Sequence, residues 1–147
     1  MIVRAAGFHA TSLAIDNDFD YLGHLREPTL ETIGANGAQA VALMLDAGAD
    51  RCRFDDVACN GHQDTLFVDA GRALFSACTV SGSVDFVFGA GQALFERCRL
   101  HSRFRPGKPV QGYVAAPSTL ASQPFGLVFR HCHLSHEPQV PAGTVLL

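Results

Sequence analysis

The sequence predicts an all-β fold, a right-handed parallel β-helix in which short strands stack into coils. Two observations predict it. A short segment recurs along the chain, and apolar residues alternate in short runs bounded by Gly, Asp or Asn, with little helical periodicity. Repeats with a constant core and loops of different length are typical of solenoids. The clearest copies are 73–80, 93–100 and 127–134, with weaker copies at 47–54 and 7–15.

The strands are expected where apolar residues alternate most clearly, at 41–45, 65–68 and 86–88. An antiparallel β-sandwich is the competing fold, and it predicts Asn-Gly hairpins between strands of matched length. Asn36-Gly37 and Asn60-Gly61 occur, but neither lies between two such strands. The repeats therefore favour the β-helix.

The composition limits the functions that this fold can carry. The chain has 147 residues, of which 48% are hydrophobic, and a formal net charge of −3. This length suits a single domain over 1–147 with enough apolar residues for a core. The slightly acidic balance and the lack of a long basic run argue against nucleic acid as a partner. No apolar stretch has the length of a membrane span, and residues 1–10 do not resemble a signal peptide.

The cysteines recur at one position of the repeat. We align Cys52, Cys78, Cys98 and Cys132 there, with Ser12 in the same place in the first copy. Equivalent residues of stacked coils lie about 4.8 Å apart, so this position predicts a ladder of small buried side chains. That spacing also permits a disulfide, for which Cys78 and Cys98, with the shortest interval, are the best candidates. A ladder does not supply tetrahedral ligands, so we expect no metal site.

Two acidic and two amide residues fall at equivalent places on three successive coils. Counting back from the cysteine position brings Asp64, Asp85, Gln63 and Gln39 into register. Stacking then places the Asp64 and Asp85 backbones about 5 Å apart. A solvent-facing row of polar residues at the corners of the coils is the structural alternative.

A pair of carboxylates at this spacing suits acid–base chemistry. Two like charges this close raise the pKa of one partner, so that one carboxylate stays ionised while its neighbour donates a proton. The amides of Gln63 and Gln39 suit a developing oxyanion, which favours acyl transfer on an ester. Carboxylates about 5–5.5 Å apart equally fit a retaining glycosidase, so spacing alone leaves both reactions open.

Three segments resemble motifs of the pectin methylesterases. Residues 61–67 (GHQDTLF) resemble the family's G-Y-Q-D-T-L-Y, and residues 81–89 (SGSVDFVFG) are similar to its G-T-V-D-F-I-F-G. Residues 37–43 (GAQAVAL) resemble G-x-Q-A-V-A-L, and weaker likeness at 8–21 and 111–118 extends the match over nearly the whole chain. The resemblance implies a β-helix that hydrolyses the methyl esters of polygalacturonate (pectin) without a metal or other cofactor.

The resemblance also implies a role for each polar motif residue. Asp85 matches the nucleophile and Asp64 the general acid and base. Gln63 and Gln39 match the amides that stabilise the tetrahedral intermediate. Pectin is accordingly the expected partner.

Two aromatic residues and two cysteines also match the family. Phe67 and Phe88 match aromatic positions of the sugar-binding cleft, with core packing as the alternative for either ring. Strict strand alternation places Phe88 opposite Asp85, so a cleft role for Phe88 requires a corner just before it, after Val87. Bacterial members carry a disulfide where Cys78 and Cys98 stand.

The chain departs from the family pattern at several places. His62 replaces the usual Tyr, and the G-R-P-W motif, whose Arg holds the nucleophilic carboxylate, is absent. We therefore expect an internal fragment, truncated at both ends and impaired in activity, with a long loop inserted at about 20–37. The intact protein is expected to be a monomer that is secreted or periplasmic, because pectin lies outside the cytoplasm.

Two other functions stay open. A non-catalytic saccharide-binding β-helix would keep the sugar-binding surface and lose the chemistry. An acyl thioester hydrolase would keep the mechanism on the same scaffold and change the substrate.

Overall fold

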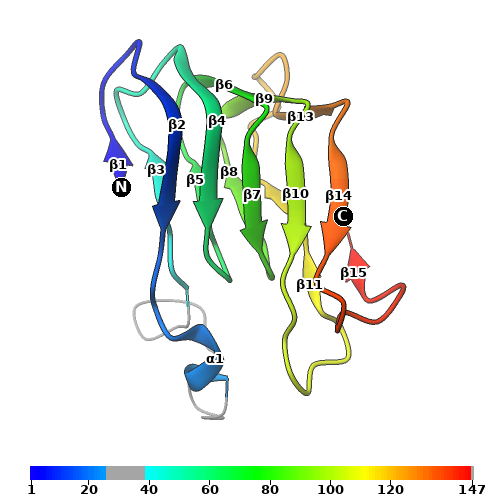
Figure 1. The fold of residues 1–147 in the computed structure, drawn as a ribbon. Helices are drawn as coiled ribbons and strands as arrows, with labels where there is room; N and C mark the ends of the chain where they lie inside the picture. Colours follow the sequence, from blue (N-terminus) through cyan, green and yellow to red (C-terminus); the bar gives the residue numbers. More distant parts are fainter. Residues whose placement is uncertain (26–38, 147) are drawn as a thin grey trace.

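The computed structural model describes residues 1–25 and 39–146 and confirms the predicted parallel β-helix (Figure 1). Every strand pair within these residues is parallel, which excludes the antiparallel sandwich. The strands expected at 41–45, 65–68 and 86–88 are present in what we call the first sheet. In order across it, this sheet contains β1 (Ile2–Val3), β3 (Leu43–Leu45), β5 (Leu66–Val68), β8 (Val87–Gly89) and β12 (Ala115–Pro117).

The second sheet lies across the core from the first. Its early strands are long, whereas each later coil divides its strand in two at a residue in the left-handed conformation, Ala77, Arg97 or His131 (φ 53, 52 and 54°). A small additional sheet pairs β11 (Gly112–Tyr113) with β15 (Val145–Leu146). The second sheet consists of β2 (His9–Asp16), β4 (Cys52–Asn60), β6 (Arg72–Ser76), β7 (Thr79–Gly82), β9 (Gln92–Glu96), β10 (Arg99–Ser102), β13 (Leu127–Arg130) and β14 (His133–His136).

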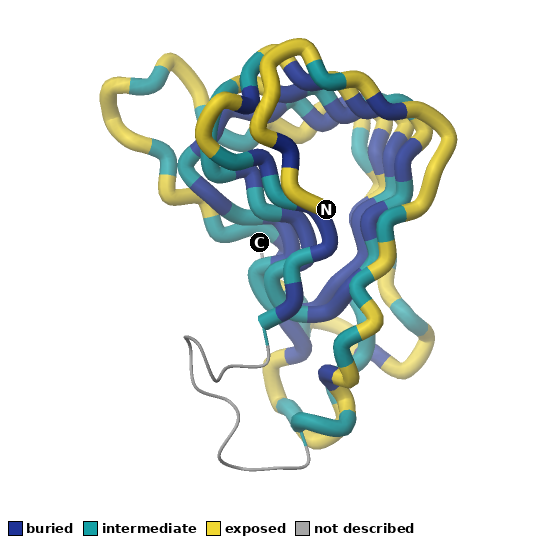
Figure 2. Tube along the Cα trace, turned by 90° about the vertical axis from the view of Figure 1, so that its left-hand side faces the viewer, coloured by how far each residue is buried: buried dark blue, intermediate teal, exposed yellow. Residues whose placement is uncertain are grey.

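The core is the interior of the stack. Seen along the stack in Figure 2, the buried stretches of successive coils superimpose, and the exposed stretches lie at corners and in loops. A row of aromatic rings crosses the coils. The Phe54 and Phe75 ring centroids are 4.7 Å apart and those of Phe75 and Phe95 are 4.8 Å apart, with Phe129 a further 4.8 Å beyond Phe95. Coil spacing thus sets the ring spacing, and each stacked pair adds about 0.5–1.5 kcal/mol beyond its buried area.

The register corrects the alignment of the cysteines. Asp55 pairs with Ser76 and Ala58 with Thr79, so the residue beside Cys78 on the preceding coil is Val57. Cys52 instead pairs with Ala73. The shared cysteine of the weak repeat 47–54 gave a false match, because the ladder position takes an apolar side chain and does not require a thiol.

The predicted alignment of the first copy of the repeat is also wrong, by one residue. Leu13, and not Ser12, pairs with Val57. Ser12 falls at the left-handed corner with Asp56, since both have positive φ (51 and 54°). The ladder therefore runs from Leu13 and Val57 to the three cysteines at 78, 98 and 132.

The ladder thiols donate to carbonyl groups of the phenylalanine row. Cys78 Sγ donates to the Phe54 carbonyl and Cys98 Sγ to the Phe75 carbonyl, both at 3.3 Å. The hydrogen bond with the neighbouring Cys78 thiol, followed by burial, raises the pKa of Cys98. Both residues are free thiols in the structure, and the disulfide between them stays a prediction.

A short helix lies where the long loop was expected. Helix α1 (Tyr21–His24) begins after Asp20, whose carboxylate accepts from the Gly23 amide at 2.8 Å. The rest of the expected loop, residues 26–37, lies outside the described residues. In the part of the chain that is described, no helix is long and apolar enough to cross a membrane.

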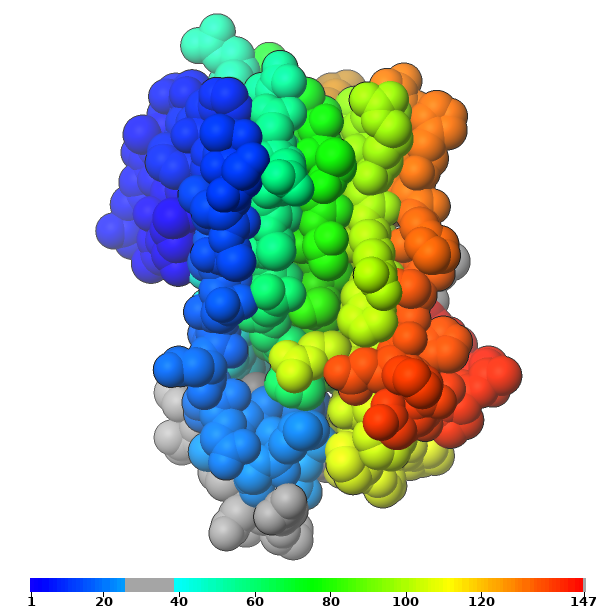
Figure 3. Space-filling view, viewed as in Figure 1, coloured from blue at the N-terminus to red at the C-terminus, as the bar shows by residue number. Residues whose placement is uncertain are grey.

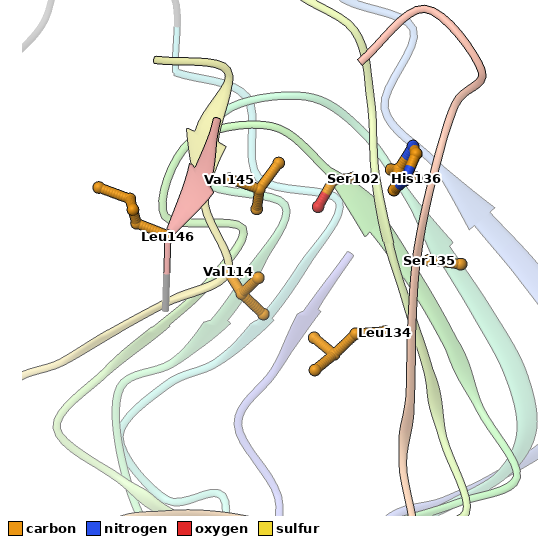
Figure 4. Close-up of a pocket in the computed structure, with 7 residues that line it drawn as sticks. All are labelled: Ser102, Val114, Leu134, Ser135, His136, Val145 and Leu146. Atoms are coloured by element: carbon orange, nitrogen blue, oxygen red, sulfur yellow. The ribbon is translucent and has the colours of Figure 1, made fainter. Parts of the chain in front are cut away.

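A hollow of about 180 Å³ lies near the end of the stack, between β10, β14 and β15 (Figure 4). Its apolar wall is formed by Val114, Leu134, Val145 and Leu146. Neither Asp64 nor Asp85 lines it. The hollow is an extension of the coil interior and is separate from the paired carboxylates.

We predict that the phenylalanine row is a main source of stability. Phe75→Ala should lower the free energy of unfolding by about 3–5 kcal/mol in urea denaturation, because Phe75 is fully buried between two rings. Phe125→Ala is the matched control: its side chain is exposed, and we expect a change within about 0.5 kcal/mol. Equal effects of the two substitutions would contradict this role of the row.

Candidate active site

Asp64 and Asp85 lie side by side on adjacent coils. Asp64 N donates to the Val84 carbonyl at 3.0 Å, and Leu66 N donates to the Phe86 carbonyl at 2.9 Å. In a parallel ladder these two bonds place Asp64 beside Asp85. Each residue precedes a strand of the first sheet by two positions, β5 for Asp64 and β8 for Asp85. The sheet thus brings together the two carboxylates that the sequence predicted as a pair.

Both residues form corners of the backbone. Asp64 has φ 63° and Asp85 has φ 49°, in the left-handed region that aspartate tolerates better than most residues. The two residues after each Asp are buried, and the third is half-buried. The corner required for Phe88 therefore lies at Asp85 itself and not after Val87. Because the corner interrupts the alternation, Asp85 and Phe88 both lie outside the core.

The pKa values of these two carboxyls differ from those of ordinary surface carboxyls because of their environment. Burial raises the pKa of Asp64, and the nearby charge of Asp85 raises it further, to about 6. Burial also raises the pKa of Asp85. The raised pKa of Asp64 suits a general acid.

Gln63 and Gln39 lie next to this pair along the backbone. Gln63 directly precedes Asp64, and the Ala40 amide donates to the Gln63 carbonyl at 3.1 Å. Gln39 therefore belongs to the neighbouring coil, beside Gln63. The structure brings together the backbones of all four predicted polar residues.

The two motif phenylalanines form a stacked pair on the outer face of the first sheet. Phe67 pairs with Phe88 in the register, and their ring centroids are 4.3 Å apart with an interplanar angle of 9°. Met44 pairs with Phe67 on the preceding coil. All three side chains are half-buried, between inward-facing neighbours that are buried. They form an apolar row close to the carboxylates.

A buried aromatic pair supports the turn that carries Asp64, and the sequence interpretation missed it. The ring of Tyr21, 1% exposed, stacks on the His62 imidazole with centroids 4.7 Å apart and an interplanar angle of 14°. Burial, together with the charge of Arg103, lowers the pKa of His62 to about 4, so the ring is neutral at pH 7. The replacement of Tyr by His keeps a flat ring at this position. This flat ring, at the position where the resembling motif has Tyr, was the signal that could have indicated a stacking partner.

The same turn is hydrogen-bonded to the next coil. The His62 carbonyl accepts from the Ser83 amide at 2.8 Å, and the Thr65 hydroxyl donates to the Ser81 carbonyl at 3.1 Å. A Cβ at Gly82 would lie 2.6 Å from the His62 carbonyl oxygen, so glycine permits this close approach. Arg103 Nη1 donates to the Gly61 carbonyl at 2.8 Å. These contacts hold the turn before Asp64 in place.

Within residues 1–25 and 39–146, no group of three or more His, Cys, Asp or Glu side chains is placed to hold a metal ion. The chemistry open to the site is that of two carboxyl groups and two amides.

Comparisons of sequence agree with the motifs. Residues 5–145 match the family model described as Pectinesterase. The chain is 43% identical over 144 residues to Pectinesterase A of Dickeya chrysanthemi, covering 95% of this chain and 39% of that protein. It is 34% identical over 134 residues to a pectinesterase of Ralstonia nicotianae, covering 86% of this chain and 31% of that protein.

Solved structures show the same fold. The pectin methylesterase PemA from Erwinia chrysanthemi matches with a TM-score of 0.89 at 41% identity, covering 98% of this chain and 43% of that chain. The pectin methylesterase from Yersinia enterocolitica matches with a TM-score of 0.87 at 40% identity, covering 98% and 46%. A pectin methylesterase in complex with a hexasaccharide matches with a TM-score of 0.90 at 42% identity, covering 98% and 43%.

A parallel β-helix with paired aspartates before two neighbouring strands is thus of the pectin methylesterase type. The chain belongs to the pectinesterase family. It spans about two fifths of the length of the curated bacterial relative that matches it over 144 residues.

We predict that Asp64 makes stability depend on pH. Its pKa is raised in the folded state from 3.8 to about 6, so the folded state holds this proton more tightly than the unfolded chain. Stability is therefore greatest below about pH 4 with respect to this group and falls as pH rises through 6. Asp64→Asn should remove that fall, on the order of 1–2 kcal/mol at pH 7 after allowance for solvent screening.

The measurement is urea denaturation of both proteins at several values between pH 4 and 7. Asp69→Asn, which removes a half-buried carboxyl at the end of β5, is the control and should keep the wild-type pH dependence. Parallel pH profiles of wild type and Asp64→Asn would contradict the raised pKa.

Proposed function

We propose that the chain is a carboxylic ester hydrolase that removes methyl esters from polygalacturonate, the backbone of pectin. One observation carries the proposal. Asp64 and Asp85 are neighbouring carboxyls on adjacent coils, the pKa of Asp64 is raised to about 6, and both stand at motif positions in a chain of the pectinesterase family.

The first half of the proposed reaction transfers the acyl group to the protein. The ionised Asp85 carboxylate attacks the ester carbonyl carbon, and the carbonyl oxygen becomes an oxyanion. The side-chain amides of Gln63 and Gln39 donate to that oxyanion. Asp64, protonated at the start, gives its proton to the methoxy oxygen as the carbon–oxygen bond breaks. Methanol leaves, and the galacturonyl group stays joined to Asp85 as an anhydride.

The second half returns the protein to its starting state. Asp64, now ionised, takes a proton from a water molecule whose oxygen attacks the acyl carbon. The bond to Asp85 breaks, and Asp85 leaves as a carboxylate. The sugar then carries a carboxylic acid in place of its methyl ester, and Asp64 is again protonated.

The Phe67–Phe88 pair is the proposed platform for the sugar chain. The stacked rings present flat apolar surface near the carboxylates, of the kind on which the apolar face of a sugar ring packs. The hexasaccharide complex of the related pectin methylesterase supports a saccharide ligand. Because pectin lies outside the cytoplasm, the protein is proposed to act as a secreted or periplasmic enzyme. All four polar site residues come from one chain, so a monomer carries the whole proposed set.

We predict that Asp85 is essential for ester cleavage. Asp85→Asn should lower methanol release from highly methylated pectin by at least about 10³-fold, because the amide cannot act as the nucleophile. Asp69→Asn is the matched control and should retain wild-type release. Pectin binding that Asp85→Asn leaves unchanged, with no methanol release even from a longer chain that includes a G-R-P-W motif, would instead favour the saccharide-binding function. Activity on a thioester alone would favour the thioester hydrolase.

The proposed proton donor predicts the alkaline limb of the pH profile. Asp64 must be protonated at the start of the reaction, so kcat for methanol release should fall as pH rises above about 6. The initial rates are measured between pH 4 and 9 with saturating pectin. A kcat that keeps rising from pH 6 to 9 would contradict Asp64 as the acid.

The aromatic pair predicts an effect on binding. Phe67→Ala and Phe88→Ala should each raise KM for pectin about tenfold with a smaller change in kcat, because the rings contact sugars rather than reacting atoms. Leu74→Ala, a half-buried apolar residue of the second sheet, is the control and should leave KM unchanged. Lower stability with unchanged KM in both phenylalanine variants would show that the pair only packs.

A further inference from the structure

Charge is distributed unevenly along the chain. The acidic residues gather in the first part, and after Asp85 only Glu96 and Glu137 are acidic. The same part of the chain contains His101, His131, His133 and His136 as well as the cations Arg97, Arg99, Arg103, Arg105, Lys108 and Arg130. The later coils are therefore basic within a chain whose net charge is −3.

Several of these residues share one surface, which we call the basic face. Arg99 on β10 pairs in the register with His133 on β14, and both side chains are exposed. Arg97 and His131 occupy the left-handed corners before these strands, and their side chains are 69% and 72% exposed. This surface is on the right of Figure 3, where the yellow-green and orange strands lie next to each other. The basic face consists of Arg97, Arg99, His101, Arg130, His131 and His133.

The basic face has more cationic groups than carboxylates. Glu96 is the carboxylate in ion-pair contact with it among the described residues: Arg130 donates to it, His131 Nδ1 is 3.1 Å from it, and Arg97 is 3.5 Å away. The charge of Glu137 also acts on His101. Arg99 contacts neutral groups, donating from Nε to the Ser135 hydroxyl at 2.9 Å and lying 3.4 Å from His101 Nδ1. Its guanidinium charge is therefore available to an anionic ligand.

The earlier coils of the same sheet differ in this respect. Arg53 donates to Asp55 at 2.5 Å, and Arg72 donates to Asp50 at 2.6 Å, so these arginines are neutralised by neighbours. The basic face is thus a local feature of the later coils. It also lies on the second sheet, whereas Asp64 and Asp85 precede strands of the first sheet.

We propose that the basic face is a second binding site for a polyuronate, the de-esterified form of pectin. The choice of this polyanion rests on the proposed function: every methyl ester removed leaves one carboxylate, so the product is a linear chain of negative charges. Guanidinium groups bind carboxylates with two parallel hydrogen bonds, and exposed rows of cations bind polyanions with release of counterions. Fully methylated pectin is uncharged at its esters and is not a ligand of this face. The site holds the protein on stretches that it has already processed.

The test compares two triple variants of matched charge. Arg97→Gln/Arg99→Gln/His133→Gln removes two arginines and one histidine of the basic face and leaves the Glu96–Arg130 pair intact. Arg51→Gln/Arg53→Gln/His9→Gln makes the same change on the earlier coils of the same sheet. Binding of polygalacturonate is measured on the Asp85→Asn background, so that no ester cleavage occurs, and methanol release is measured separately on the catalytically intact background.

We expect the basic-face variant to bind polygalacturonate at least tenfold more weakly, with the control variant unchanged. Binding by the unmodified face should weaken about tenfold between 50 and 200 mM salt, and methanol release should be the same in all proteins. Equal binding by both triple variants would overturn the proposal. Equally tight binding of duplex DNA would overturn it too, by showing a general polyanion surface. Polygalacturonate binding without methanol release from the intact chain would reject the esterase function and leave the basic face supported.

Discussion

Neighbouring strands of a parallel sheet lie about 4.8 Å apart, and this spacing determines where the important side chains of the chain fall. The same repeat distance sets the 4.7–4.8 Å spacing of the Phe54, Phe75 and Phe95 rings in the core. It also sets the separation of the Asp64 and Asp85 backbones outside the core. Packing and chemistry therefore depend on one register, and a shift of that register would disturb both.

The corners at Asp64 and Asp85 connect this register to the site. A left-handed residue reverses which side of the chain faces the core, so each aspartate leaves the interior while the next two residues enter it. Two corners on adjacent coils then present two carboxyls to the same region, where partial burial raises both pKa values. The backbone conformation thus places the two carboxyls together, and the raised pKa values follow from that placement.

Much of this could be predicted from residue patterns, for physical reasons. The alternation of apolar residues predicted the positions of β3, β5 and β8 correctly, because each of these strands buries every second side chain. Counting along the repeats brought Asp64 and Asp85 together, since loops of different length do not change the coil spacing. The Cys52 alignment failed because the ladder position selects for an apolar side chain, which Val57 provides as well as a thiol does. The corner at Asp85 and the Tyr21–His62 stack were missed because alternation carries no information on φ, and the two rings are distant in sequence.

In a solenoid each coil contacts only its neighbours, so structure is lost by peeling from the outer coils inward. The strands β5 and β8, which follow the paired aspartates, are covered by β3 and β1 on one side and β12 on the other. Thermal fluctuations that detach an outer strand therefore leave both carboxyls in place. Because each of these two strands is paired on both sides, the geometry of the site does not rest on a free sheet edge.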